Sequence, residues 1–208
     1  MLILLVFVWF LLYNIYMRII AGKFKGKKLN EFEIDSTRPT TDLVREAMFD
    51  KIGYDIVDSV FLDLFAGTGA CGIEALSRGA KICYFVDSAQ DAIKLINKNL
   101  KSINAQNCEI IKSDYVSALE SFAKNSAVFD FVFLDPPYKS SFAEDAISKI
   151  FDKDMLAPNG IIVWEHDKTK LDYVKQNFPD SKTKKYGQKY LTYILLHRRV
   201  WTQSNADG

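Results

Sequence analysis

The sequence predicts an α/β fold built on a mostly parallel sheet with helices on both faces. Two observations indicate this class: short apolar runs alternate with amphipathic helical segments, and a glycine-rich turn joins the first such run to the next helix. Parallel strands covered on both faces read as continuous apolar runs, and each needs a helical crossover to its neighbour. A chain of 208 residues is long enough for one such domain and too short for two.

Each element follows from its local pattern. The five apolar runs predicted as parallel strands are 61–65, 81–86, 108–111, 130–134 and 161–165, and the helices between them are 70–78, 89–103, 115–123 and 141–150. A further helix is predicted at 168–178. Two last runs, 182–186 and 190–196, read as an antiparallel hairpin that closes a seven-stranded sheet. Before the first strand, Thr41 or Asp42 caps a helix that follows Pro39 and runs to about Ile52.

The first sixteen residues are almost wholly apolar and uncharged. They lack the basic region and the cleavage site of a signal peptide. As a helix they reach about 24 Å, short of the roughly 30 Å hydrocarbon core of a bilayer. We expect an extension upstream of a true start at Met17, which makes the protein cytoplasmic and membrane contact unexpected; a marginal anchor or a buried helix is the alternative. The expected organisation is 1–16 as this extension, 17–52 as a basic arm with its helix, 53–199 as the main domain and 200–208 as a tail.

Charge is concentrated near the start of the chain. The 27 Lys and Arg residues almost balance 26 Asp and Glu residues, but the segment from Met17 to Asn30 is basic throughout. Its basic residues, which occur without an acid, are Arg18, Lys23, Lys25, Lys27 and Lys28. Such a segment is typical of a surface for a polyanion, and the alternative is a solvated lysine face.

The cysteines and histidines exclude several kinds of chemistry. The three cysteines, Cys71, Cys83 and Cys108, form no CxxC pair, so neither a disulfide framework nor a zinc site is expected. The two histidines are distant in sequence from the glycine-rich turn, which argues against a histidine base or a histidine metal site. We therefore expect no metal.

The glycine-rich turn is a GxGxxG formed by Gly67, Gly69 and Gly72. Small residues between a strand and a helix let the backbone approach a cofactor at the helix N-terminus. This turn alone fits a nicotinamide dinucleotide as well as other cofactors that contain adenosine.

Four predicted strands each bring an aspartate to the same edge of the sheet. Asp63 lies in the first strand, Asp87 ends the second, Asp114 follows the third and Asp135 ends the fourth. Ligands of open parallel sheets bind beyond the carboxyl ends of the strands, so these acids are candidate site residues. Asp87, about twenty residues past the glycines, is placed to accept ribose hydroxyls. Asp114 fits a helix cap equally well.

The fourth strand ends in a more specific signal, Asp135-Pro136-Pro137-Tyr138. Two prolines cannot continue a strand ladder, and they offer carbonyl groups without competing N–H groups. A carboxylate and a proline carbonyl together can accept both hydrogens of an exocyclic amino group, while a tyrosine ring stacks on a planar base. A Pro-Pro corner without chemistry is the alternative.

The turn DLFAGTGACG, the acid Asp87 and the DPPY corner, in this order, resemble the class I S-adenosylmethionine-dependent amino-methyltransferases, which have a Rossmann-like fold. More narrowly, MRIIAGKFKGKKL, RPTTDLVREAMF, LDLFAGTGACGIEALSRGA, FLDPPY and KKYGQKYL are similar to the bacterial RsmD family of 16S rRNA (guanine-N2)-methyltransferases. The likeness extends from Met17 to about Arg199. One departure is Asp87, where Glu is commoner in the family and serves a ribose equally well.

The resemblance implies S-adenosyl-L-methionine as the cofactor and the N2 amino group of a guanine in 16S rRNA as the methyl acceptor, in a 30S subunit or an assembly intermediate. The implied catalytic residues are Asp135, Pro136, Pro137 and Tyr138. The implied cofactor-binding residues are Asp63, Phe65, Ala66, Gly67, Gly69, Asp87, Ser88 and Asp114. The implied RNA-binding residues are Arg18, Lys23, Lys25, Lys27, Lys28, Arg38, Thr41 and Arg45. Lys184, Lys185 and Lys189 of the late hairpin are further candidates for the RNA surface, and the alternative, which the residues alone favour, is that they are solvated lysines.

Other functions explain parts of the sequence. A DNA adenine-N6 methyltransferase also uses a DPPY corner, but little of the chain remains for a module that reads DNA. A protein glutamine methyltransferase resembles NPPY instead. A nicotinamide-dependent dehydrogenase explains the glycine turn and leaves the corner without a role. A membrane-anchored, non-catalytic binding protein explains residues 1–16 and leaves the four aspartates unexplained.

Overall fold

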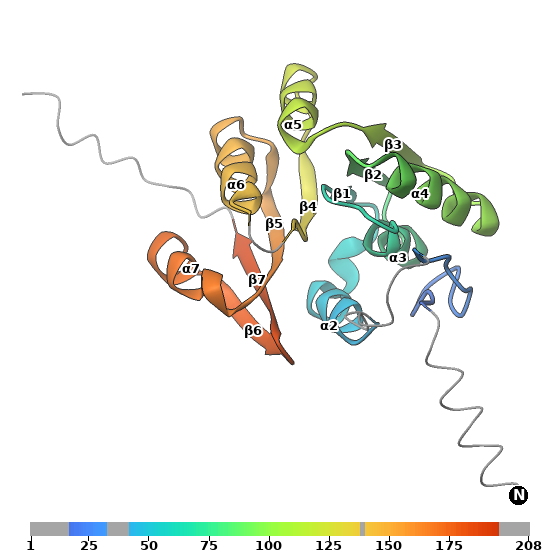
Figure 1. The fold of residues 1–208 in the computed structure, drawn as a ribbon, viewed down its shortest axis with the longest axis horizontal. Coiled ribbons are helices and arrows are strands. Elements are labelled where there is room, and N and C mark those ends of the chain that lie inside the picture. Colours follow the sequence, from blue (N-terminus) through green and yellow to red (C-terminus); the bar gives the residue numbers. More distant parts are fainter. Residues whose placement is uncertain (1–16, 33–41, 138–139, 196–208) are drawn as a thin grey trace, which may run out of the picture.

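The computed structural model describes residues 17–32, 42–137 and 140–195 and contains one seven-stranded sheet (Figure 1). The strands are β1 (Val60–Asp63), β2 (Ile82–Asp87), β3 (Cys108–Lys112), β4 (Phe129–Leu134), β5 (Leu156–His166), β6 (Lys182–Tyr186) and β7 (Lys189–Leu195). They lie in the order β3-β2-β1-β4-β5-β7-β6. β7 is antiparallel to both β5 and β6, and the other neighbours are parallel. This confirms the predicted α/β fold and its closing hairpin.

Helices cover both faces of the sheet (Figure 1). They are α2 (Asp42–Ile52), α3 (Ala70–Arg78), α4 (Gln90–Ile103), α5 (Tyr115–Lys124), α6 (Phe142–Asp152) and α7 (Leu171–Asn177), with 3-10 turns η1 (Gly53–Ile56) and η2 (Lys168–Lys170). One core contains side chains of α2, α3 and α4, among them Phe49 and Ile73. The other contains side chains of α5, α6 and α7, among them Leu119 and Ile147. Burial of these apolar faces supplies the main driving force for folding.

The boundaries differ from the predicted ones mainly in the C-terminal half. β5 begins five residues earlier than predicted, at Leu156, because Pro158, Asn159 and Gly160, which are typical of a turn, form an irregularity within the strand. The predicted helix at 168–178 is divided into η2 and α7. The division follows Asp167, whose carboxylate accepts a hydrogen bond from the Thr169 N–H and caps the short first turn.

The basic arm, here residues 17–32, is packed on the domain rather than extended from it. Ile19, Phe24 and Leu29 are buried in the core shared with α2, α3 and α4. Arg18 and Lys28 pair in an antiparallel bridge, so the arm folds back on itself. Burial of every fifth residue leaves the lysines between them exposed.

Polar contacts with α3 hold the arm in place. The Glu74 carboxylate, fully buried, accepts hydrogen bonds from the Ile20 and Ala21 N–H groups at 2.8 and 2.9 Å. Gly22 has a φ of +79°, and a Cβ there would lie 1.8 Å from the Ser77 carbonyl oxygen. Only glycine fits this close approach of two backbones. The arm is therefore a built part of the domain.

Within the described ranges, no helix has the length and the apolar character needed to cross a bilayer. The predicted segments 1–16 and 200–208 lie outside the described residues.

Candidate functional site

The carboxyl ends of β1, β2 and β4 meet at the centre of the sheet. β1 lies between β2 and β4. The chain adds β2 and β3 on one side of β1 and then continues with β4 and β5 on the other side, so the strand order reverses there. This reversal is the place where open α/β sheets bind ligands. It brings Asp63, Asp87 and Asp135 to one edge, as their positions in the sequence predict.

Asp87 organises the glycine turn. Its carboxylate accepts one hydrogen bond from the Gly67 N–H at 2.8 Å and another from the Ala89 N–H at 2.8 Å. Gly67 and Gly69 have φ values of +54° and +78°, which favour glycine. A Cβ on Gly72 would lie 2.3 Å from the Phe85 ring, so the third glycine allows α3 to pack closely on β2. The glycine turn thus leaves its backbone accessible to a ligand next to the Asp87 carboxylate.

A cavity of about 630 Å³ lies beside this turn, and we call it the strand-end cleft. Its lining residues are Leu64, Phe65, Gly67, Asp87, Ser88, Ser113, Asp114, Tyr115, Asp135, Pro136, Pro137 and Phe142. Three of the aromatic rings form a continuous row, with centroids 5.5 Å apart for Phe65 and Tyr115 and 5.2 Å apart for Tyr115 and Phe142. The cleft combines an apolar wall with carboxylates, as sites for a nucleoside do.

A second cavity, of about 270 Å³, lies between the glycine turn, the arm and α2, and we call it the arm-side cavity. Its lining residues are Met17, Glu31, Phe32, Val44, Arg45, Met48, Asp63, Phe65, Ala66, Gly67, Thr68, Ala70, Cys71, Phe133, Asp135, Glu165 and Lys189. Phe65, Gly67 and Asp135 line both cavities. The two cavities therefore meet at the Asp135 end of β4.

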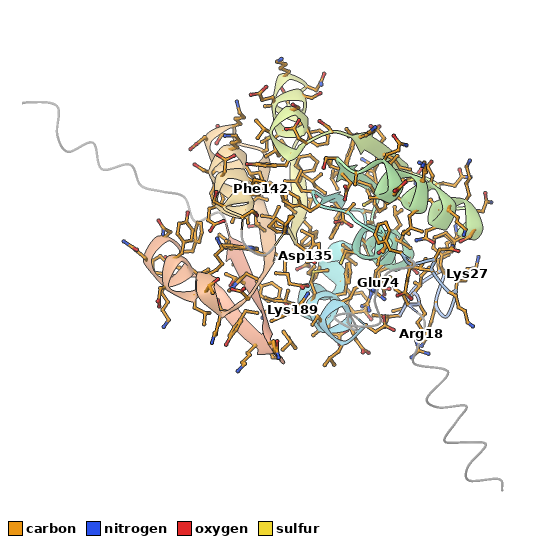
Figure 2. All side chains as sticks on the ribbon, viewed as in Figure 1. Arg18, Lys27, Glu74, Asp135, Phe142 and Lys189 are labelled. Atoms are coloured by element: carbon orange, nitrogen blue, oxygen red, sulfur yellow. The ribbon has the colours of Figure 1, made fainter. Side chains whose placement is uncertain are left out.

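Asp135 occupies the central position of the site. Figure 2 shows it between Phe142, which lines the strand-end cleft, and Lys189, which lines the arm-side cavity. Pro136 is buried and Pro137 is exposed. Tyr138, the fourth residue of the predicted corner, lies outside the described residues.

Asp63 is buried and carries an unusual ionisation. Its side chain accepts a hydrogen bond from the Gly72 N–H at 2.9 Å, in the first turn of α3. Burial raises the pKa of this carboxyl group to about 7, although the Gly72 hydrogen bond lowers it; the negative charges of Asp135 and Asp87 raise it further. Because this pKa is close to neutral pH, a cationic group bound beside Asp63 would shift its carboxyl group to the ionised form.

Asp114 has a local role as well as a place in the cleft. Its carboxylate caps α5 by accepting a hydrogen bond from the Ser117 N–H at 2.9 Å. Hydrogen bonds from Ser117 lower the pKa of this exposed carboxyl group. The capping alternative and the cofactor hypothesis are thus compatible, because a carboxylate has acceptor sites left after one bond.

The remaining predicted cofactor residues lie at the two cavities or beside them. Phe65 and Gly67 line both cavities, Ser88 lines the strand-end cleft and Ala66 lines the arm-side cavity. Gly69 precedes α3 as its N-terminal cap residue. Their roles toward a cofactor stay predictions.

The predicted RNA-binding residues divide into two groups. Lys23, Lys25, Lys27 and Lys28 are exposed on the arm, and Arg18 is half-buried beside them. Arg18 and Lys27 lie together on the side of the molecule that carries the arm (Figure 2). Arg38 and Thr41 lie outside the described residues.

Arg45 differs from the expectation of a surface contact. Its side chain is only 4% exposed, and its guanidinium donates to the Arg18 carbonyl at 2.6 Å and to the Asp42 carboxylate at 2.8 Å. Its Nε also lies 3.8 Å from a Glu74 carboxylate oxygen. Arg45 therefore joins the arm to α2 and adds positive charge near the buried Glu74 of α3, whose direct ion-pair partner is Arg78 at 2.8 Å.

Several residues that line the cavities are not among the predicted site residues. They include Glu165, Tyr115 and Phe142, and also Lys189, for which the sequence indicates only a place on the hairpin surface. A signal for Glu165 was present, since it stands at the end of the fifth predicted strand as the aspartates stand at the ends of the others. Tyr115 and Phe142 follow strands at greater distances and carry no comparable signal. In the part of the chain that the structure describes, no group of three His, Cys, Asp or Glu side chains is placed to hold a metal ion.

Comparison with known proteins agrees with this geometry. The model of the family described as "Conserved hypothetical protein 95" matches residues 17–195. The chain is 34% identical to ribosomal RNA small subunit methyltransferase D of Escherichia coli over 192 residues, which cover 92% of this chain and 94% of that protein. It is 42% identical to YlbH of Bacillus subtilis over 153 residues, 73% of this chain and 83% of that one.

Solved structures place the fold in the same group. The yhhF protein of Escherichia coli is 31% identical and superposes with a TM-score of 0.74 over 86% of this chain and 97% of that one. The fold is thus the Rossmann-like class I methyltransferase fold. The family model and these relatives together show that the chain belongs to the RsmD family of S-adenosylmethionine-dependent small-subunit ribosomal RNA methyltransferases.

Proposed function

We propose that this protein transfers a methyl group from S-adenosylmethionine to the exocyclic N2 amino group of a guanine in 16S rRNA, acting in the cytoplasm on a 30S subunit or an assembly intermediate. The observation that carries the proposal is the position of Asp135. This acid ends β4, begins the Asp-Pro-Pro corner and borders both cavities. A methyl donor in one cavity and a base in the other would meet beside it.

The strand-end cleft fits the nucleoside part of the cofactor. Its volume falls within the range of roughly 300–1,000 Å³ that is usual for small-molecule sites. The Asp87 carboxylate has acceptor sites left for ribose hydroxyls after its two bonds to backbone N–H groups. Asp114, at the other side of the cleft, can accept from an adenine amino group.

The glycine turn and Asp63 fit the amino acid part of the cofactor. A Cβ on Gly67 would meet nothing within 4 Å, so the space over this residue is open. Asp63 lines the adjoining arm-side cavity, and a bound ammonium group would favour its ionised form. When bound, S-adenosylmethionine supplies an electrophilic methyl group on a sulfonium centre.

The corner at the end of β4 orients the amino group that receives the methyl. The Asp135 carboxylate and the Pro136 carbonyl accept the two hydrogens of the guanine N2, and Tyr138 stacks on the ring. This holds the nitrogen in line for attack and favours its pyramidal form. The carboxylate would also stabilise the positive charge that develops on the nitrogen as the N–C bond forms and the sulfonium–methyl bond breaks. The extra proton would then leave N2 to the carboxylate or to solvent, and S-adenosylhomocysteine would be the co-product. The base must leave its stack in the RNA to reach this position.

The arm supplies the contact with RNA outside the site. Four lysines, Lys23, Lys25, Lys27 and Lys28, are exposed on a segment that is anchored at both ends. A rigid basic surface positions a phosphate backbone without reading its sequence.

The test is to incubate the full-length protein with labelled S-adenosylmethionine and 30S particles or 16S rRNA from cells that lack the enzyme, then to identify the labelled nucleoside by mass spectrometry. The expected product is N2-methylguanosine, which is lost with Asp135→Ala. A matched control is Asp152→Asn, which removes an exposed carboxylate on α6 and should leave the product unchanged.

Three results would contradict the proposal or a part of it. Label in N6-methyladenine of DNA, and none in rRNA, would indicate a DNA methyltransferase. Label in rRNA on a position other than guanine N2 would keep the family assignment and reject the proposed acceptor. Faster transfer to protein-free 16S rRNA than to particles would reject the 30S subunit and its assembly intermediates as the substrate.

A further inference from the structure

Three carboxylates lie on one face of the sheet near its carboxyl edge, and two of them are neighbours. In the ladder between β4 and β5, Leu134 is opposite Trp164, so the following residues, Asp135 and Glu165, are neighbours. Leu134 and Trp164 belong to the core on the α5–α7 face. Side chains alternate along a strand, so Asp135 and Glu165 point to the opposite face, as Asp63 of β1 does. All three line the arm-side cavity.

A lysine faces this group from the hairpin. Lys189 begins β7, which runs antiparallel to β5, and its ammonium group forms an ion pair with the Glu165 carboxylate. The side chain of Glu165 is 5% exposed and that of Lys189 is 16% exposed. A buried ion pair is weak evidence for stability, because desolvation offsets the attraction between the charges. Its place in the wall of a cavity points to a role toward a ligand.

The order of these groups matches the Watson–Crick edge of guanine. That edge presents the N2 amino group, the N1–H donor and the O6 acceptor in sequence. Asp135 is the acceptor at the corner, Glu165 is the acceptor beside it, and Lys189 is the donor that pairs with Glu165. We propose that Glu165 accepts a hydrogen bond from N1–H and that Lys189 donates to O6, so that this pair selects guanine while Asp135 holds N2.

This inference rests on the proposed function and adds to it the origin of base selectivity. An Asp-Pro-Pro corner alone holds the amino group of adenine as well as that of guanine. Glu165 distinguishes them, because an unprotonated N1 would direct its lone pair at a carboxylate. That contact would set two acceptors against each other in a site closed to water, so bases lacking N1–H are rejected. Asp135 is the catalytic residue, and Glu165 and Lys189 determine specificity.

The test uses a base that has the reacting amino group but lacks the N1–H donor and the O6 acceptor. 2-Aminopurine has the amino group on C2, an unprotonated N1 and no oxygen on C6. Once the methylated guanine has been mapped, 16S rRNA is assembled by ligation with guanine or 2-aminopurine at that position and reconstituted into particles. The measured quantity is kcat/KM for each particle, expressed as the guanine to 2-aminopurine ratio. Intrinsic reactivity of the two amines cancels when variants are compared.

The diagnostic variant is Glu165→Gln, which keeps the size of the side chain and adds an amide donor for an unprotonated N1. The wild-type protein should prefer guanine strongly. In the variant, transfer to 2-aminopurine should rise and transfer to guanine should fall, so that the ratio drops at least about tenfold. A second variant, Lys189→Met, should lower kcat/KM only for guanine, since 2-aminopurine has no O6 to lose.

The chain offers a matched control. Lys170 and Glu144 form a second ion pair of similar burial, with side chains 21% and 14% exposed, and neither residue lines the arm-side cavity. Glu144→Gln should leave the guanine to 2-aminopurine ratio at the wild-type value. Thermal unfolding of all three variants shows whether they are folded.

The outcomes separate the two proposals. If the wild-type protein methylates no guanine in rRNA, the proposed function fails. If it does, but the ratio is unchanged in folded Glu165→Gln and in folded Lys189→Met, the pair has only a structural role and this inference is overturned. An equal loss for both bases in both variants also overturns it, because that result indicates damage to the site rather than a change of selectivity.

Discussion

The strand-end cleft and the arm-side cavity share three residues and are built in different ways. The cleft is formed almost wholly by residues directly after the strands β1 to β4, together with the start of α6. The arm-side cavity also needs the arm, α2, β5 and β7, which are distant in the sequence. The cleft thus has the parts common to sites for adenosine cofactors, whereas the cavity has parts that suit one acceptor. We therefore expect binding of the cofactor's nucleoside part and choice of the acceptor to be separable.

The sharpest test of this division is a change at the residue shared by both cavities. Asp135→Asn should lower kcat by at least about 10³-fold, because it removes the charge that stabilises the transition state and replaces one accepting oxygen by an amide donor. The affinity for S-adenosylmethionine, measured by calorimetry, should change little. Strong loss of cofactor affinity together with kcat would show that the two cavities do not act separately.

The second prediction concerns the cleft alone. Asp87→Asn should weaken S-adenosylmethionine binding by roughly 10- to 100-fold, since hydrogen bonds to a charged group contribute about 1.5–3 kcal/mol. Calorimetry measures the affinity, and turnover at saturating cofactor should stay near the wild-type value. Asp114→Asn serves as the comparison, and its smaller effect would agree with a carboxylate that also caps α5. Equal losses in the two variants would argue against a dominant role of Asp87.

The third prediction concerns the arm-side cavity in the free protein. The pKa of Asp63 is about 7 in the folded state and near its ordinary value of 3.8 in the unfolded state, so the folded protein binds more protons between these values. Its contribution to stability is therefore full below the unfolded pKa and is lost as the pH rises through 7. Asp63→Asn keeps an acceptor for the Gly72 N–H and does not titrate.

Urea unfolding of both proteins measures this effect. The free energy of unfolding of Asp63→Asn relative to wild type should increase by about 2 kcal/mol between roughly pH 5 and pH 8. A difference that is constant with pH would mean that Asp63 ionises normally. Saturating S-adenosylmethionine should reduce the change, because the bound ammonium group lowers the pKa of this carboxyl group.

The smallest expected effect lies outside both cavities. Lys25→Ala removes one exposed charge of the arm and should weaken RNA binding about two- to fivefold, with a decrease of roughly 0.7–0.9 in the salt slope. Cofactor affinity should be unchanged. Lys101→Ala, on the exposed side of α4, is the matched control. Equal effects of the two substitutions would indicate a general influence of charge rather than an RNA-binding arm.

Much of the cleft could be predicted from the sequence, because its residues lie within a few positions of strand ends. Asp87, Asp114 and Asp135 each follow an apolar run, and parallel strands bring such positions together whatever the rest of the chain does. Local patterns also located the strands to within a few residues. The exception, β5, shows the limit, since Pro158 and Gly160 indicate a turn locally, while the pairing of Leu156 and Ile161 with β4 on either side of them keeps this segment within one strand.

The sequence by itself determined the α/β fold, the glycine turn and the acids at the strand ends, because these depend on local periodicity and on chain direction. Only the tertiary structure decided that Arg45 is buried under the arm, that Glu74 holds the arm on α3, and that Lys189 meets Glu165. Such contacts join residues 24 or more positions apart. They depend on how helices and the hairpin pack on the sheet, and no local pattern records that packing.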